Sequence, residues 1–200
     1  MKKIINPALL FIGIAAACNP AADQQKRSVS TAETVMNVKE KKVDSTKLLI
    51  AGKQAGHIYL GQDMKTVSEL LGRPDGGDAA MGSELGIWNK KEPLIIFSSY
   101  RDSNMVIKDV KQISVSSGSF STAEGIRTGV SLTVLKKTYP DLKKAASYTR
   151  KEAKLTVYDV ASKGIAFDVQ NDTCTAITIH PVNKSVNEAY LTMYPDWKKS

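Results

Sequence analysis

The chain has 200 residues, of which 42% are hydrophobic and 24% are charged, and its formal net charge at pH 7 is +8. This composition is typical of a globular domain with extensions, and it excludes a disordered chain, a collagen-like chain and a multi-span membrane protein. Two cysteines and two histidines leave little material for a zinc site, which takes four ligands from Cys, His or carboxylate, so we expect neither a metal nor another cofactor.

The N-terminus has the layout of a secretory signal peptide. Two lysines precede an apolar run at residues 8–17, which is too short for a permanent transmembrane helix. The run ends in Ala15-Ala16-Ala17-Cys18, which resembles the lipobox of bacterial lipoproteins. The resemblance implies that residues 1–17 are removed and that Cys18 carries acyl chains such as palmitate. Two or more such chains anchor a protein stably to a membrane.

Residues 18–47 predict a lipid-anchored flexible tether, because they contain few large apolar side chains to bury. Asn19 follows the cysteine, where the enterobacterial pattern has Asp for retention at the inner membrane. That resemblance implies an outer-membrane lipoprotein on the periplasmic or surface face of the cell envelope. We expect no nucleic acid as a partner in this compartment.

Cysteine and histidine usage does not predict an enzyme. Lipidation of Cys18 leaves Cys174 without a disulfide partner, and we expect an unreactive thiol with limited access. His180 lies on the same predicted strand, ~20 Å away at ~3.3 Å per residue, which is too far for a Cys–His dyad. No Gly-x-Ser-x-Gly motif is present. A hydrolase that depends on His57 or His180 remains the weakest alternative.

Two segments in the folded part predict short helices with the same layout. In residues 58–75, a glycine and the N-cap residue Asp63 precede an apolar-periodic stretch that stops at Pro-Asp. Residues 126–141 repeat this order with Ser131 as the N-cap. The recurrence indicates an internal repeat.

Strands are expected after each helix, from alternation or apolar runs between turn signals. They cover residues 84–88, 94–100, 107–115, 145–149, 155–160, 165–169 and 175–180. Short loops between them favour antiparallel pairing. The predicted fold class is therefore α+β in two layers, with tandem helix-plus-antiparallel-sheet units at 48–121 and 122–182. Residues 183–200 form a C-terminal segment.

The sequence Ile58-Tyr59-Leu60-Gly61-Gln62-Asp63-Met64, followed by Leu70-Leu71-Gly72-Arg73-Pro74-Asp75, resembles the opening of the SmpA/OmlA family. These are small lipoproteins of the outer-membrane β-barrel assembly machine. The same unit in tandem is the fold of the β-lactamase inhibitor protein, so the resemblance implies that fold over residues 56–180. In the inhibitor protein the concave sheet face binds the partner. The chain departs from the family pattern at Gly61-Gln62-Asp63, where Gly-Met-Thr/Ser is usual.

The predicted function is that of a membrane-anchored, non-catalytic lipoprotein that binds another envelope protein through its exposed sheet face. Period-two alternation places several aromatic and polar side chains on the face opposite the helices. The candidate protein-binding residues are Trp88, Tyr100, Tyr158, Asp168 and His180. In the alternative that we leave open, the tether or the C-terminal segment covers these side chains.

The second candidate function is binding of an anionic lipid or glycan. Residues 126–163 hold most of the excess of basic over acidic side chains. The candidate anion-binding residues are Lys136, Lys137, Lys143, Lys144, Arg150 and Lys151. A simple solvated face is the alternative for this segment.

Overall fold

A four-stranded sheet opens the folded part of the computed structural model, which describes residues 44–90, 93–188, 193–194 and 196–200. Its order is β3-β2-β1-β8. The strands are β1 (Leu48–Ile50), β2 (Gln54–Ala55), β3 (Ile58–Tyr59) and β8 (Ser121–Thr122). Before β1, Asp44 caps the 3-10 turn η1 (Ser45–Lys47), so the end of the predicted tether is folded. The predicted signal peptide and the Cys18 anchor lie outside the described residues.

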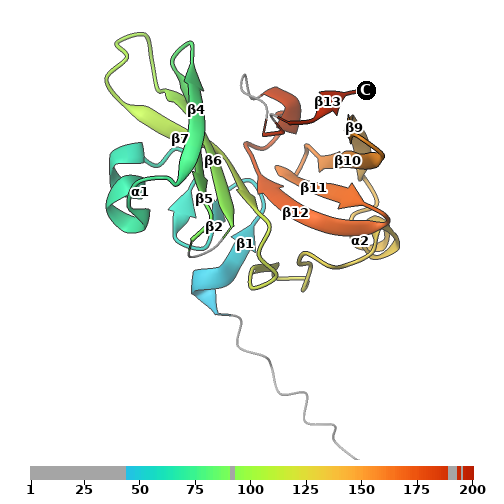
Figure 1. Cartoon of the computed structure of the whole chain (residues 1–200). Coiled ribbons are helices and arrows are strands. Elements are labelled where there is room, and N and C mark those ends of the chain that lie inside the picture. The colour runs from blue at the N-terminus through green and yellow to red at the C-terminus, as the bar shows by residue number, and fades with distance from the viewer. Residues whose placement is uncertain (1–43, 91–92, 189–192, 195) are drawn as a thin grey trace, which may run out of the picture. The chain divides into compact units, whose positions relative to one another are not determined.

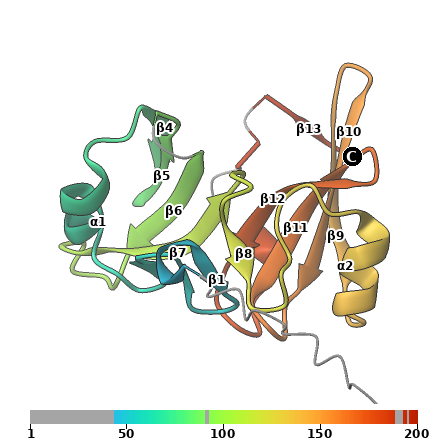
Figure 2. The same ribbon diagram turned by 90° about the horizontal axis from the view of Figure 1, so that it is seen from below.

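Both predicted helices are confirmed, and each begins after its predicted cap. α1 (Met64–Leu71) follows Asp63, whose carboxylate accepts from a first-turn amide at 2.8 Å. α2 (Leu132–Thr138) follows Ser131, whose hydroxyl accepts from a first-turn amide at 3.4 Å. These bonds satisfy amides that have no partner within a helix. The helices lie at opposite ends of the large sheet (Figures 1 and 2). Within the described ranges, no helix is long and apolar enough to span a membrane.

The large sheet has nine strands in the order β13-β9-β10-β11-β12-β7-β6-β5-β4. They are β4 (Gly76–Ala80), β5 (Ser83–Trp88), β6 (Leu94–Tyr100), β7 (Lys108–Val115), β9 (Lys143–Arg150), β10 (Ala153–Val160), β11 (Ile165–Gln170), β12 (Thr173–Ile179) and β13 (Lys198–Lys199). The predicted strands are all present. The strand at 94–100 has its predicted bounds, and the other six have shifted ends. Sequence analysis missed β4 and β13, because small residues and lysines have low strand propensity.

The predicted fold class of tandem helix-plus-sheet units is wrong. The described part of the chain is mostly β, and its two short α-helices accompany one continuous nine-stranded antiparallel sheet and a separate four-stranded sheet. β7 pairs with β12, with Val115 opposite Ile177 and Ile113 opposite Ile179. β1 and β8, the first and last strands of the predicted first unit, pair in parallel in the small sheet. Pairing between β7 and β12 satisfies backbone groups that two separate sheets would leave as exposed edges.

Two apolar clusters pack on opposite faces of strands β10 and β11. The first core includes Phe167 and Tyr158, together with residues of both helices and of the small sheet. The second core consists of Ala146, Tyr148, Leu155, Val157, Ala166 and Val186, with Tyr194 and Trp197 packed against it. Because neighbouring residues of a strand point to opposite faces, both faces of this part of the sheet are covered.

The C-terminal segment supplies the cover over the second core. The Tyr194 hydroxyl donates to Asp168, at 2.6 and 2.7 Å from its two carboxylate oxygens, and the Tyr194 ring lies 4.5 Å from the Tyr148 ring. β13 then adds to the sheet beside β9. The alternative in which the C-terminal segment covers the predicted binding face is therefore confirmed around Asp168.

Candidate functional site

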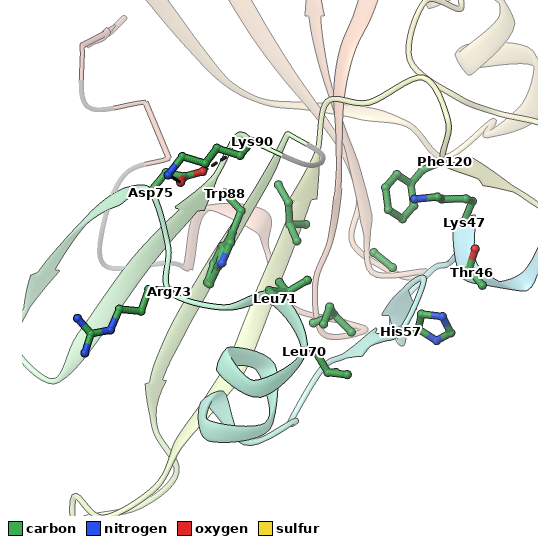
Figure 3. Close-up of a pocket in the computed structure, with 13 residues that line it drawn as sticks. Thr46, Lys47, His57, Leu70, Leu71, Arg73, Asp75, Trp88, Lys90 and Phe120 are labelled. Carbon is green, nitrogen blue, oxygen red and sulfur yellow. Dashed lines mark hydrogen bonds and ion pairs between the residues drawn. The ribbon is translucent and has the colours of Figure 1, made fainter.

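The candidate site is a cavity of about 570 Å³ beside the C-terminal end of α1 (Figure 3). Helix α1, the small sheet and strands β5 and β6 all contribute to its walls. The apolar lining consists of Ala55, Ile58, Leu70, Leu71, Trp88, Leu94 and Phe120. The polar lining consists of Thr46, Lys47, His57, Arg73, Asp75 and Lys90. An apolar cavity of this volume with a few polar groups is typical of a small-molecule site.

Trp88 forms a wall of the cavity and joins the large sheet to the end of α1. Its indole N–H donates to the Gly72 carbonyl at 3.1 Å, and Gly72 ends the helix with a φ of 78°. A Cβ atom at Gly86 would lie 2.6 Å from the Trp88 ring, so a glycine there lets the ring lie against its own strand. The indole is therefore held by its packing and by a hydrogen bond.

Asp75 fixes the loop after α1 to the end of β5. Its carboxylate accepts from the Asn89 and Lys90 amides at 2.8 and 3.1 Å, and it pairs with the Lys90 ammonium at 2.9 Å. The Asn89 amide, followed by Lys90, lowers the pKa of Asp75 to about 2. The carboxylate is therefore ionised at neutral pH and leaves this side of the cavity with a neutralised pair.

Basic side chains lie on two sides of the cavity, and the one on the Asp75 side is paired with that carboxylate. Figure 3 shows Lys47 beside Phe120 on one side and Lys90 with Asp75 on the other. The Lys47 ammonium lies 4.9 Å from the centre of the Phe120 ring. Among the lining residues that the structure describes, Asp75 is the single carboxylate and Arg73 adds a further cation, so this part of the lining carries a net positive charge. An acidic group on an otherwise apolar ligand complements this arrangement.

Thr46 supplies a hydroxyl to the described lining of the cavity, where His57 also lies. The Thr46 hydroxyl donates to the Asp44 carboxylate at 2.8 Å, so its proton is not held by His57. A nucleophilic hydroxyl needs a base within hydrogen-bond reach.

The predicted protein-binding residues do not form one exposed face, and for three of them the prediction of exposure is wrong. Trp88, Asp168 and His180 are buried. Tyr100 is half-buried at the end of β6, and Tyr158 is half-buried against the first core.

Strand register explains this error. Tyr158 lies opposite Phe167, whereas Val157 lies opposite Asp168, so Tyr158 and Asp168 point to different faces. Leu155 and Val157 share the face of Asp168 and belong to the second core.

His180 forms a buried pair that sequence analysis missed. Its Nε2 atom lies 3.0 Å from an oxygen of Asp159, and the other oxygen of that carboxylate accepts from the Val186 amide at 3.0 Å. The Nδ1 atom lies 3.1 Å from the Pro181 carbonyl. The histidine side chain is fully buried, so a substrate in solvent cannot contact it. The pair connects β10 to the segment after β12.

The predicted anion-binding residues are all exposed, and they are distributed between α2 and strand β9 with its turn. Lys136 and Lys137 lie in the last turn of α2, where cations favour the helix dipole. Sequence analysis did not place Lys198 and Lys199 with them, but β13 brings both beside β9.

Cys174 is expected to resist alkylation in the native protein. Its thiol is buried in the first core and donates to the Ala176 carbonyl at 3.5 Å. Burial raises the pKa of the thiol to about 12, and the thiolate is the reactive form. Iodoacetamide labelling at pH 8, mapped by peptide mass spectrometry, should modify Cys174 only after denaturation in urea. Rapid labelling of the native chain would contradict the buried position.

Comparison with known proteins finds no matching family model and no matching curated protein. Among solved structures, a cysteine-rich secretory protein (SAV1118) from Staphylococcus aureus matches with a TM-score of 0.39 and 9% identity, over 66% of this chain and 46% of that chain. This chain therefore spans less than half of the staphylococcal protein. The uncharacterized protein yfeY from Escherichia coli matches with a TM-score of 0.37 and 13% identity, over 66% of this chain and 98% of that chain. At these TM-scores neither likeness bears on function.

Proposed function

We propose that this chain is a membrane-anchored, non-catalytic lipoprotein of the bacterial cell envelope that binds an acyl chain with an acidic head group in the α1–β5 cavity. The observation that carries the proposal is an apolar cavity of about 570 Å³ with a positively charged rim. Fatty acids and anionic lipids share this chemistry. The proposed anchor at Cys18 would keep the cavity near a membrane that holds such molecules.

The two halves of the ligand meet different parts of the lining. The Trp88 indole and the leucines of α1 offer an apolar wall, and burial of the acyl chain there is favourable by ~25 cal/mol per Å². The acidic group lies at the rim near Lys47 or Lys90. Lys90 already pairs with Asp75, so it would be shared between the two acids.

Fluorescence of Trp88 provides the test. The chain has two tryptophans, so the W197F substitution leaves Trp88 as the single reporter. The C18A substitution in the same full chain removes the expected acyl chains, which could otherwise occupy the cavity. We expect dodecanoate, added below its micellar concentration, to shift Trp88 emission saturably, and dodecanol to bind more weakly because it lacks the charge.

A matched pair of helix substitutions serves as the control. Leu70 lines the cavity and is 54% exposed, whereas Val134 on α2 is 42% exposed and lies outside that lining. L70E should weaken dodecanoate binding at least about tenfold, because it places a carboxylate in the apolar wall that the acyl chain would contact. V134E should leave the affinity unchanged. Equal effects of the two substitutions, or no emission change with dodecanoate, would refute the proposal.

A further inference from the structure

Strand β13 extends the basic surface of β9 with residues from the far end of the chain. Lys198 pairs with Thr149, and Lys199 with Tyr148, in antiparallel register. Together with the β9–β10 hairpin this creates a surface that we call the basic edge. It consists of Lys143, Lys144, Arg150, Lys151, Lys198 and Lys199, all of which are exposed. Figure 1 shows β13 and the C-terminus beside β9 and β10.

The charge of the basic edge is mostly uncompensated. The acidic side chains on the same elements are Glu152, Asp196 and Asp159, which are half as many as the six cations. The Asp159 carboxylate is already bonded to His180 and to the Val186 amide. Within the described ranges, Arg150 is the only one of the six cations with a carboxylate in reach, at 4.0 Å from Asp196. The basic edge therefore attracts negative charge from outside the chain.

An aromatic side chain lies among these cations. The Arg150 guanidinium lies 5.3 Å from the centre of the Trp197 ring, and Trp197 is half-buried against the second core. Tryptophan is enriched at the level of lipid head groups, where its ring is partly apolar and partly hydrated. Lysine and arginine clusters beside such rings are attracted to anionic leaflets.

We propose that the basic edge rests on an anionic lipid surface. Its cations lie at the two ends of β9, about 23 Å apart at ~3.3 Å per residue, so they match an extended surface better than a compact ligand. Five of the six are lysines, which act as mobile point charges and do not form the rigid fork that selects a shaped acid. The inference rests on strands β9, β10 and β13 and is independent of the α1–β5 cavity.

The experiment uses Trp197 as a reporter in the full chain carrying C18A, which removes the proposed anchor, and W88F, which removes the other tryptophan. The chain is mixed with vesicles of phosphatidylglycerol and phosphatidylcholine, or of phosphatidylcholine alone, each with a head-group spin label. We expect at least about tenfold stronger co-sedimentation with the anionic vesicles at 0.1 M NaCl, and quenching of Trp197. Raising NaCl to 0.5 M should abolish both, because salt screens surface charges. Insertion of the apolar run at residues 8–17 does not depend on the lysines of the basic edge, so substitution of those lysines separates it from the proposed contact.

Matched lysine substitutions locate the effect. The test variant is K143Q/K144Q/K198Q/K199Q, and the control variant is K53Q/K65Q/K163Q/K184Q, which removes the same charge from exposed lysines elsewhere. The test variant should lose at least about tenfold in binding to anionic vesicles, and the control should lose much less. Equal losses, equal binding to both lipids, or binding without Trp197 quenching would overturn the inference. Binding to soluble polyglutamate without binding to vesicles would overturn it in favour of an acidic protein partner.

Discussion

The D168N substitution is expected to stabilise the protein at pH 8 and to leave its stability near pH 4 almost unchanged. Asp168 is buried beneath the C-terminal segment, and its carboxylate accepts from Tyr194. Burial raises the pKa of Asp168 from 3.8 to about 7, although the hydrogen bond from Tyr194 opposes this shift. Asparagine keeps an acceptor for the Tyr194 hydroxyl and never ionises.

The direction in which pH changes the free energy of unfolding follows from proton linkage. Between pH 4 and 7 the folded protein holds a proton on Asp168 that the unfolded chain has released, so the free energy of unfolding falls as pH rises. At ~1.36 kcal/mol for each pH unit between the two pKa values, the loss is roughly 4 kcal/mol by pH 8. The neighbouring Tyr148, Tyr194 and Cys174 do not titrate in this range, since burial raises the pKa of each.

Urea unfolding at pH 4.5, 6 and 8 measures this effect for the native chain and for D168N. The difference between the two free energies of unfolding should grow with pH and reach a few kcal/mol. Other ionisable groups contribute equally to both proteins and cancel in the difference. A difference that stays constant across this range would show that Asp168 ionises normally in the folded protein.

The D159A substitution should destabilise the protein by roughly 3–5 kcal/mol, the cost of removing one partner from a buried pair. The Asp159 carboxylate joins the fully buried His180 ring to the Val186 amide, with 3.0 Å to each. Alanine leaves both groups buried without their acceptor, and each unsatisfied group costs ~1–3 kcal/mol. D159N retains one acceptor oxygen and should cost about half as much.

Asp141 provides the matched control, because it is exposed in the turn between α2 and β9. D141A should change the free energy of unfolding by less than ~0.5 kcal/mol. Urea titrations of the three variants at pH 7 give the comparison. If D159A and D141A unfold at the same urea concentration, the buried pair has no structural role.

Local features of the sequence determined the helices and most strands of this protein. A capping side chain bonds to amides only two or three residues away, so Asp63 and Ser131 marked the helix starts without any tertiary information. Alternation and turn residues likewise marked the main strands. The lipobox-like sequence ending in Cys18 is also local, and the lipid anchor that it implies stays a prediction.

Only the tertiary structure decided how the strands combine and which side chains are buried. Pairing of β7 with β12, and of β13 with β9, joins segments remote in sequence, and no local signal specifies such partners. Alternation within a strand gives two faces but does not say which one meets the helices. Sequence analysis therefore placed Trp88 on the wrong face of the sheet and predicted that Asp168 is exposed. The cavity, and the C-terminal segment that covers Asp168, exist only because residues distant in sequence pack together.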